Sequence, residues 1–371
     1  MQFTLSDEQL MLQALVERFL KDRYPPGKRA SYRAAPSGYS SSNWAQLADL
    51  GVFAAPFPAE HGGLGAGPME SIVVMEALGR GLAAEPVLEQ IVLPGRLILH
   101  SGSAAQRRRW LPQIMAGERH LSVAHIEQAE SFDLTHVNAV VQSGAAGMQI
   151  SGEKTMVPGS GGADEFIVSA REPGRADDPD AIGFYLVRAD APGVEARPFR
   201  LVDGSVACQL SLHGASVTEK LDCDFRAFAQ AVDDARIAAC AEMIGIMSVL
   251  LEATLDYVRN RKQFGAALGS FQVIQHRLAD LYVLLEQSRS HLYRAVLSAH
   301  KPHGGAAAVA GMKSYISAAA VQMGEQCIHL HGGMGTTDEL AIGHCHKRLL
   351  VLATMFGDAD SELQRFTRLS A

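Results

Sequence analysis

Three long stretches with helical spacing constrain the fold of this chain more than any other feature of its sequence. They cover residues 233–260, 271–298 and 306–330. Apolar side chains nearly encircle each stretch, so each helix must be covered on most sides, as in a helical bundle or a subunit interface. We therefore expect a C-terminal helical bundle domain over residues 229–371.

The first part of the chain also has helical spacing. Ser6 and Gln9 form a capping-box pattern, and an apolar stripe follows at Leu12, Leu15, Val16, Phe19 and Leu20. Shorter helical patterns occupy residues 44–50, 69–82, 90–100 and 107–115. Prolines and glycines exclude a helix from residues 56–65. We expect an N-terminal helical domain over residues 1–120.

The middle of the chain is β-prone. Short runs typical of strands lie at residues 137–141, 147–150, 165–170, 184–187 and 207–212, and Gly, Pro and Asp clusters separate them. This spacing is typical of a small sandwich or barrel, so we expect a middle β-barrel domain over residues 121–228. A chain of 371 residues exceeds the length of one growing core, which agrees with several domains.

Charge and cysteine content narrow the class of protein. The net charge of -7 argues against a nucleic-acid binder, which needs a basic field. The five cysteines form no CxxC pair, as expected in a reducing compartment. Residues 1–8 lack the basic start and apolar core that are typical of a signal peptide, and the most apolar stretch, residues 237–251, is interrupted by Glu242 and Ser248. We expect a cytoplasmic protein without membrane insertion.

Four motifs, in order along nearly the whole chain, resemble those of the acyl-CoA dehydrogenase family. Residues 5–9 resemble its opening helix, and residues 60–65 its Glu-(Tyr or His)-Gly-Gly signature. The strongest match is Arg-Lys-Gln-Phe-Gly at residues 261–265, and residues 332–335 match its Gly-Gly-x-Gly turn. The resemblance implies an α+β, mainly α fold: an N-terminal helical domain, a middle β-barrel and a C-terminal four-helix bundle.

The resemblance also implies FAD as the cofactor. A guanidinium offers a planar fork of donors to phosphate, so Arg261 is expected on the FAD pyrophosphate of a neighbouring subunit. Phe264 resembles the aromatic residue that packs near the adenosine, and glycines at 332 and 333 would let the backbone approach the cofactor closely. Further cofactor contacts are implied for Gln263, Gln272, His329, Gly332, Gly333 and Ile126.

The family's reaction needs a base. It removes an α-proton from an acyl-CoA thioester and passes a β-hydride to flavin N5, which gives a trans-2,3 double bond. The family's usual base is a Glu before Gly-Thr, and the alignment puts Asp358 there, with Asp360 as the second candidate. An Asp after a glycine is also common in turns and helix caps.

A second family position for the base lies in the Asp-x-x-Arg motif, which here covers residues 233–236. That position is Ala235, which has no side chain able to accept a proton. Asp358 is therefore the expected base. Arg236 is expected to organise the adjoining acyl or base region, and Asp233 to contribute to substrate binding.

Several side chains depart from the family pattern around the flavin. Ile126 and Phe132 replace a Thr and a Ser, Met156 replaces an aromatic residue, and Pro158 replaces a hydroxyl residue near N5. Backbone amides of residues 125–133 would still be able to bind the flavin pyrimidine edge. The pattern resembles a divergent branch of the family, the small subunit of heteromeric pimeloyl-CoA dehydrogenases.

Several alternatives stay open at this point. The resemblance implies a homodimer or tetramer that passes electrons to an electron-transfer flavoprotein, or a heteromer with a second acyl-CoA dehydrogenase subunit. A weakly active or inactive partner subunit, an acyl-CoA-binding scaffold, and an oxidase or monooxygenase of the same fold are the alternatives within this architecture. A metal site would draw on His329, His331, His344, Cys345 and His346.

Overall fold

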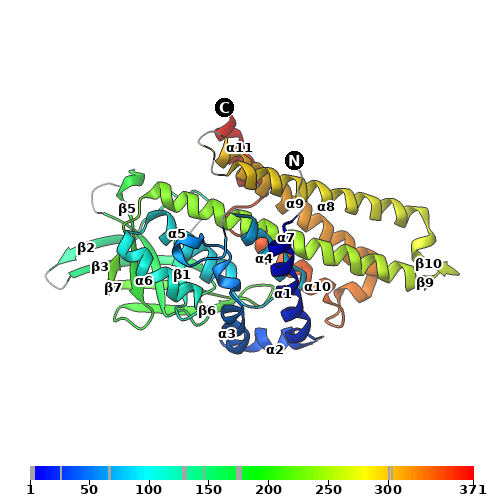
Figure 1. Cartoon of the computed structure of the whole chain (residues 1–371), viewed down its shortest axis with the longest axis horizontal. Coiled ribbons are helices and arrows are strands. Elements are labelled where there is room, and N and C mark those ends of the chain that lie inside the picture. Colours follow the sequence, from blue (N-terminus) through cyan, green and yellow to red (C-terminus); the bar gives the residue numbers. More distant parts are fainter. Residues whose placement is uncertain are drawn as a thin grey trace. The chain divides into compact units, whose positions relative to one another are not determined.

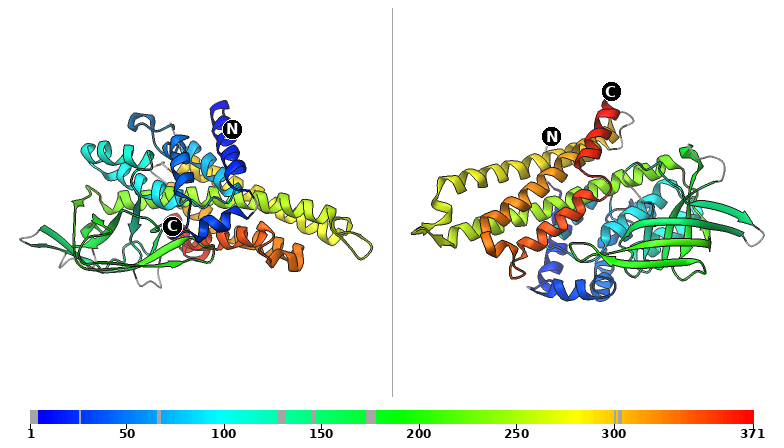
Figure 2. Two further views of the ribbon diagram at one scale, coloured as in Figure 1. Left: turned by 90° about the horizontal axis from the view of Figure 1, so that it is seen from below. Right: turned by 180° about the vertical axis from the view of Figure 1, so that it is seen from behind.

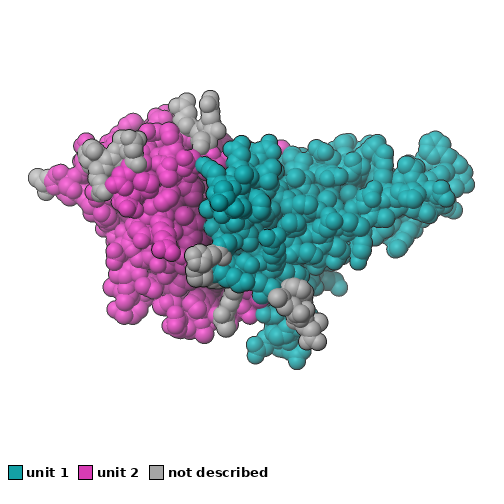
Figure 3. Space-filling view, turned by 90° about the horizontal axis from the view of Figure 1, so that it is seen from above, with its two compact units in different colours: residues 1–27, 71–83, 236–371 teal, residues 28–70, 84–235 magenta. Residues whose placement is uncertain are grey.

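The computed structural model describes residues 5–25, 27–65, 68–127, 132–144, 147–172, 178–299, 301 and 304–371. The chain divides into two compact units (Figure 3). Unit 1 comprises Met1–Gly27, Ser71–Ala83 and Arg236–Ala371, and unit 2 comprises Lys28–Glu70 and Ala84–Ala235. Both units combine segments that are distant in sequence. The division into 1–120, 121–228 and 229–371 stays a prediction.

Unit 1 is a helical bundle (Figure 1). The helix α9 packs against α8, α10 and α11. The bundle helices are α7 (Phe225–Asn260, in this unit from Arg236 onward), α8 (Gln272–Ser298), α9 (Gly305–His331), α10 (Ala341–Thr354) and α11 (Ala359–Ser370). The expected C-terminal bundle is confirmed, although α7 begins eight residues before residue 233, at Phe225.

Two N-terminal helices complete unit 1, α1 (Asp7–Arg23) and part of α4 (Pro68–Arg80). The capping box of Ser6 and Gln9 is present at the start of α1. Glycines let α4 and α7 approach closely, because a Cβ at Gly79 would collide with the Glu242 carbonyl oxygen and one at Gly245 with the Glu76 carbonyl oxygen. Two short strands, β9 (Lys262–Gln263) and β10 (Ala266–Ala267), form a hairpin between α7 and α8.

Unit 2 contains the sheet and the remaining helices (Figures 1 and 2). The helices are α2 (Lys28–Ala34), α3 (Ser41–Asp49), the π-helical turn η3 (Leu88–Val92), α5 (Leu93–Ser101) and α6 (Ala104–Met115). Gly51 ends the α3 region with a φ of 73°, as its position after the apolar pattern predicts. Residues 59–61 make only a short 3-10 turn.

The sheet has the strand order β6-β7-β3-β2-β4-β5-β8, and β1 also pairs with β4. Its strands are β1 (Leu121–Ala124), β2 (Val140–Gly144), β3 (Gly147–Pro158), β4 (Glu165–Arg171), β5 (Ile182–Arg188), β6 (Val194–Arg200), β7 (Val206–Ser216) and β8 (Glu219–Lys220). One face carries an apolar core that includes Ile150, Phe166, Tyr185 and Leu210.

The expected barrel is wrong in one respect, because the sheet is not closed. Its first and last strands, β6 and β8, do not pair with each other within the described residues. The strand β8 has only two residues, and all but the first residue of β6 are exposed. Closure needs two long edges that hydrogen-bond to one another, and here one edge is too short and the other faces solvent.

Among the described residues, one helix is long and apolar enough by length and composition to cross a membrane, namely α7. Its most apolar window is 83% buried inside the protein. That burial is typical of the core helix of a globular bundle. The sequence predicts this helix over residues 233–260, and the observed helix is longer by eight residues at its start.

Candidate active site

Asp358 lies at the N-cap of α11 and is half-buried. Its Oδ1 accepts a hydrogen bond from the Ser361 backbone N–H at 2.8 Å. Its other carboxylate oxygen, Oδ2, makes no hydrogen bond to any described residue. One oxygen therefore fixes the carboxyl group at the helix end, and the other is left to accept a proton or hydrogen bond. The capping role and the proposed base role concern different oxygens of the same group.

Arg236 fixes the backbone on both sides of Asp358. Its Nε donates to the Phe356 carbonyl oxygen at 2.9 Å, and its Nη2 pairs with the Glu362 carboxylate at 2.7 Å. Both side chains of this pair are 2% exposed. Phe356 has a φ of 63°, a conformation rarely adopted by a non-glycine residue. The buried pair therefore ties α7 to the turn that carries Asp358.

Lys313, on α9, supports the same turn from a fully buried position. Its ammonium donates to the Ser317 hydroxyl and to the carbonyl oxygens of Leu352 and Ala353 at the end of α10. Burial lowers the pKa of Lys313 to about 8. Neither Lys313 nor Glu362 could be predicted from the sequence, because the partner of a buried charged residue is defined only once the helices are packed.

The residues expected to bind the cofactor gather at one end of the bundle in unit 1. The Tyr257 ring stacks on His331 at 4.3 Å, and Arg277 contacts the His329 ring nitrogen at 3.1 Å. These contacts bring together the end of α7, the start of α8 and the end of α9. The exposed residues at this end include Arg261, Gln263, Phe264, Gln272, His329, Gly332 and Gly333.

This end of the bundle carries features that the chain's own packing does not explain. Phe264 is 90% exposed and has a φ of 56°. Gly332 has a φ of 60°, and a Cβ added at Gly332 or Gly333 would meet no atom within 4 Å. A strained exposed aromatic residue and an open glycine turn fit a surface that receives another molecule. The donor set of Arg261 and Gln263 suits a pyrophosphate, so these residues fit FAD.

The two groups of predicted residues in unit 1 are far apart. Asn260 follows Arg236 by 24 residues on the continuous helix α7, which at 1.5 Å per residue is about 36 Å. The Arg261–Phe264 hairpin and the turn that carries Asp358 are therefore separated by most of this length of α7.

In unit 2 a buried ion pair fixes the segment that contains Ile126. The Lys154 ammonium donates to the Glu127 carboxylate at 2.7 Å and to the Ser169 hydroxyl at 2.9 Å. Glu127 also accepts from the backbone N–H groups of Asn138 and Ala139. Burial lowers the pKa of Lys154 to about 8, although Glu127 opposes this shift. Burial would raise the pKa of Glu127, but Lys154 and the two amides lower it on balance.

The backbone around Ile126 is equally fixed. The Thr155 N–H donates to the Ile126 carbonyl oxygen at 2.9 Å, and the Thr155 hydroxyl donates to the Glu127 carbonyl oxygen at 2.9 Å. Ile126 and Met156 are half-buried, and Pro158 is buried. The scaffold of this segment is thus complete, whereas Ile126, Met156 and Pro158 offer no side-chain hydrogen bond. Residues 128–131 of the expected amide set lie outside the described residues.

Asp233 is half-buried on α7, and within unit 2 its neighbour Asp234 accepts from His100 at 2.7 Å. The alternative metal site gains no support, because the described residues contain no group of three or more His, Cys, Asp or Glu side chains that could hold a metal ion.

The comparisons with known proteins agree with the fold and with the motifs. The family model described as "Acyl-CoA dehydrogenase, N-terminal domain" matches residues 6–118. The model described as "Acyl-CoA dehydrogenase, C-terminal domain" matches residues 225–368.

Curated and solved relatives cover nearly the whole chain. Mitochondrial isovaleryl-CoA dehydrogenase of Arabidopsis thaliana is 26% identical over 97% of this chain and 90% of its own length. A solved variant of the Tcur3481-Tcur3483 steroid ACAD is 29% identical, with a TM-score of 0.89 over 99% of this chain and 98% of its own. Butyryl-CoA dehydrogenase of Megasphaera elsdenii, at 21% identity and a TM-score of 0.90 over 99% of both chains, shares the fold. The chain therefore belongs to the acyl-CoA dehydrogenase family, and with it to the FAD-dependent oxidoreductases that act on acyl-CoA.

Proposed function

We propose that this chain introduces a trans-2,3 double bond into an acyl-CoA thioester, with Asp358 as the base. The free oxygen of Asp358 would take the α-proton, and the electron pair of the broken C–H bond would form the new double bond as the β-hydride leaves. Bound FAD supplies the hydride acceptor at N5. The observation that carries the proposal is the position of Asp358, held at a helix start beside the buried pair of Arg236 and Glu362 with one oxygen unbound.

The unusual length of the proposed base has a chemical consequence. An Asp is one methylene shorter than the Glu that the family uses, so the turn itself must bring the carboxyl group to the substrate. The φ of 63° at Phe356 and of 122° at Gly357 define the path of that turn. Arg236 holds the turn through the Phe356 carbonyl group, and we propose that Arg236 is a positioning residue for Asp358.

The test is anaerobic bleaching of the bound flavin by acyl-CoA. The panel should include short branched and steroid acyl-CoA esters, because an isovaleryl-CoA dehydrogenase and a steroid ACAD are among the relatives. Asp358→Asn should keep the flavin spectrum and slow bleaching by roughly 10²–10⁴-fold, the usual contribution of a general base. Asp360→Asn, at the second candidate for the base on the exposed first turn of α11, should bleach at the unchanged rate. Unchanged bleaching in Asp358→Asn would remove this residue from the mechanism.

A second candidate function is that of a partner subunit in a heteromeric acyl-CoA dehydrogenase. Ile126, Met156 and Pro158 favour it, since none of them gives the flavin ring a side-chain hydrogen bond. A solved ChsE4-ChsE5 complex from Mycobacterium tuberculosis, 24% identical with a TM-score of 0.87 over 99% of this chain and 98% of its own, shows the fold in a two-chain assembly. One flavin per purified chain supports the first candidate. A colourless chain that gains activity only with a second subunit supports the other.

We further propose that the assembly is a homodimer or tetramer in the cytoplasm, and that an electron-transfer flavoprotein receives the electrons. The separation of about 36 Å between Arg236 and Asn260 along α7 supports the need for a second chain. Sedimentation of the purified chain with FAD would measure the assembly, and reduction of the flavoprotein after addition of acyl-CoA would test the acceptor.

A further inference from the structure

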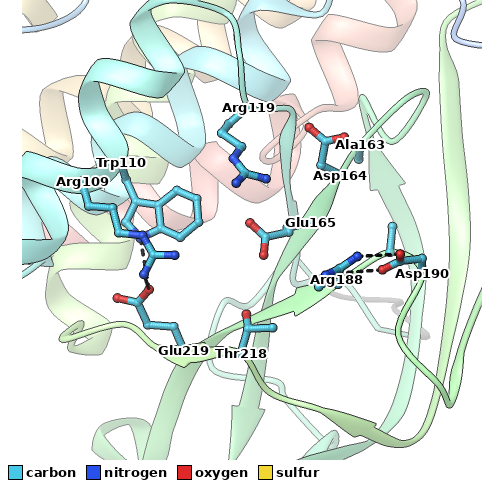
Figure 4. Close-up of a pocket in the computed structure, with 11 residues that line it drawn as sticks. Arg109, Trp110, Arg119, Ala163, Asp164, Glu165, Arg188, Asp190, Thr218 and Glu219 are labelled. Carbon is cyan, nitrogen blue, oxygen red and sulfur yellow. Dashed lines mark hydrogen bonds and ion pairs between the residues drawn. The ribbon is translucent and has the colours of Figure 1, made fainter.

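A charged pocket in unit 2 lies outside all the residues assigned above. It has a volume of about 560 Å³ and is lined by α6, by the start of β4, by the end of β5 and by the β7–β8 connection (Figure 4). Volumes of this order are typical of sites for small molecules. None of Ile126, Met156 or Pro158 lines this pocket, so it is separate from the segment expected to meet the flavin.

Glu165 occupies the middle of the pocket and is 8% exposed. Its carboxylate makes no hydrogen bond or ion pair with the described residues, and its Oε2 is buried without a partner. Burial raises the pKa of Glu165, while the guanidinium groups of Arg119, Arg109 and Arg188 oppose this and Asp164 adds to it. A buried carboxylate oxygen normally has a donor, and here the position for that donor is open.

Arg119 provides the opposite charge. Its Nε donates to the Gln113 side-chain oxygen at 3.1 Å, and its guanidinium lies 6.0 Å from the centroid of the Trp110 ring. Its two terminal nitrogen atoms make no hydrogen bond to a described residue. Figure 4 shows the Arg119 side chain reaching toward the space beside Glu165. A guanidinium with both terminal nitrogen atoms open presents a fork suited to a carboxylate.

Most other charges of the pocket are already paired. Arg109 pairs with Glu219 at 3.1 Å, and Arg188 pairs with Asp190 at 2.7 Å. The pocket charges without an ion-pair partner are then the guanidinium of Arg119 and the carboxylates of Glu165 and the exposed Asp164. The Asp164 Oδ2 accepts only one hydrogen bond, from a backbone N–H at 3.1 Å. A simple anion would face two carboxylates, and a simple cation would face the guanidinium. A neutral molecule with both charges close together satisfies the two sides at once.

We propose that this pocket binds a small zwitterion of the α-amino acid class. The ammonium group of the zwitterion donates hydrogen bonds to Glu165, with Asp164 nearby. Its carboxylate accepts hydrogen bonds from both terminal nitrogen atoms of Arg119. This adds a ligand site to the chain and does not depend on Asp358 or on the flavin.

The test is isothermal titration of the full chain with bound FAD at pH 7.5, using each of the twenty L-amino acids. At least one amino acid should bind, and its N-acetyl and carboxamide derivatives should not, because each loses one charge. Glu165→Gln and Arg119→Gln should each weaken binding by about tenfold or more. The matched control is Arg197→Gln, because Arg197 also lies in unit 2 and pairs with Glu195 on an exposed strand.

The outcomes separate this proposal from the proposed dehydrogenation. Glu165→Gln should leave flavin bleaching by acyl-CoA unchanged, and its melting temperature should not fall, since it removes a buried charge. The proposal is overturned when no amino acid binds at millimolar concentration. It is equally overturned when binding survives both substitutions, or when the N-acetyl derivative binds as well as the free amino acid.

Discussion

Two regions are expected to bind the cofactor, and they differ in how closely their side chains match the family pattern. The end of the bundle in unit 1 has the family's Arg-x-Gln-Phe-Gly motif at residues 261–265, although His329 stands where the family has a Gln, and its Phe264 is 90% exposed. The segment around Ile126 in unit 2 keeps a buried scaffold, Glu127 with Lys154, but its side chains toward the flavin have changed. The two regions therefore differ in burial: the predicted contact residues of one are exposed, and the scaffold of the other is a buried ion pair.

The largest effect on stability is expected from removing the buried Lys154–Glu127 pair of unit 2. Lys154→Met should destabilise the protein by about 3–5 kcal/mol, because it leaves Glu127 charged, buried and without its cation. Calorimetry of the purified chain measures this. The double variant Lys154→Met with Glu127→Gln should recover much of the loss. Equal melting temperatures for the single variant and the unchanged protein would show that the pair does not hold the segment.

The stability of unit 2 should also depend on pH, because the buried His125 adjoins the Lys154–Glu127 pair. Burial lowers the pKa of His125 to about 3, below the usual value of about 6.5 in an unfolded chain. The unfolded state therefore binds more protons between these values, and stability is lost as the pH falls from 6.5 toward 3. We expect a loss of about 2 kcal/mol between pH 6.5 and 5. His125→Phe should flatten the profile over this range, and an unaltered slope would assign the acid sensitivity to other groups.

The smallest effects on stability are expected at the exposed end of unit 1. Gly332→Ala should cost about 1–3 kcal/mol, because a φ of 60° with a ψ of -142° is a conformation that residues with a Cβ rarely adopt. Gly333→Ala should change stability by less than about 0.5 kcal/mol, since a Cβ there meets no atom. Both should weaken FAD binding, measured as flavin released on dilution. Full flavin retention in Gly333→Ala would exclude close contact with the cofactor at this turn.

Much of the fold could be predicted from the sequence, because local apolar spacing indicates the helices. The stripe from Leu12 to Leu20 predicts the helix α1, and the helical spacing over residues 271–298 and 306–330 gives the bounds of α8 and α9 within a residue. The strand β6 was missed, because its alternation is short and Pro198, which lacks a backbone donor, interrupts it. The open edge of the sheet was missed too, because closure depends on which strands meet and leaves no local pattern.

The candidate site was predicted only where motifs name residues. Arg261 and Gly332 follow from motif position, and the structure brings them to one end of the bundle. The partners of Arg236 and Lys154 could not be derived, because burial selects them and the contacts span more than a hundred residues in one case. Glu165 gave no sequence signal at all, since a lone acidic residue at the start of a strand is ordinary.

The central claim is that one active site needs Asp358 from one chain and the Arg261–Phe264 hairpin from another. A hybrid assembly tests it most directly, with one chain carrying Asp358→Asn and its partner carrying Arg261→Gln and Phe264→Ala. Each variant alone should fail to bleach with acyl-CoA. The purified hybrid dimer should recover about half of the unmodified activity, because one of its two sites then has both intact parts. A hybrid that stays inactive would contradict the claim.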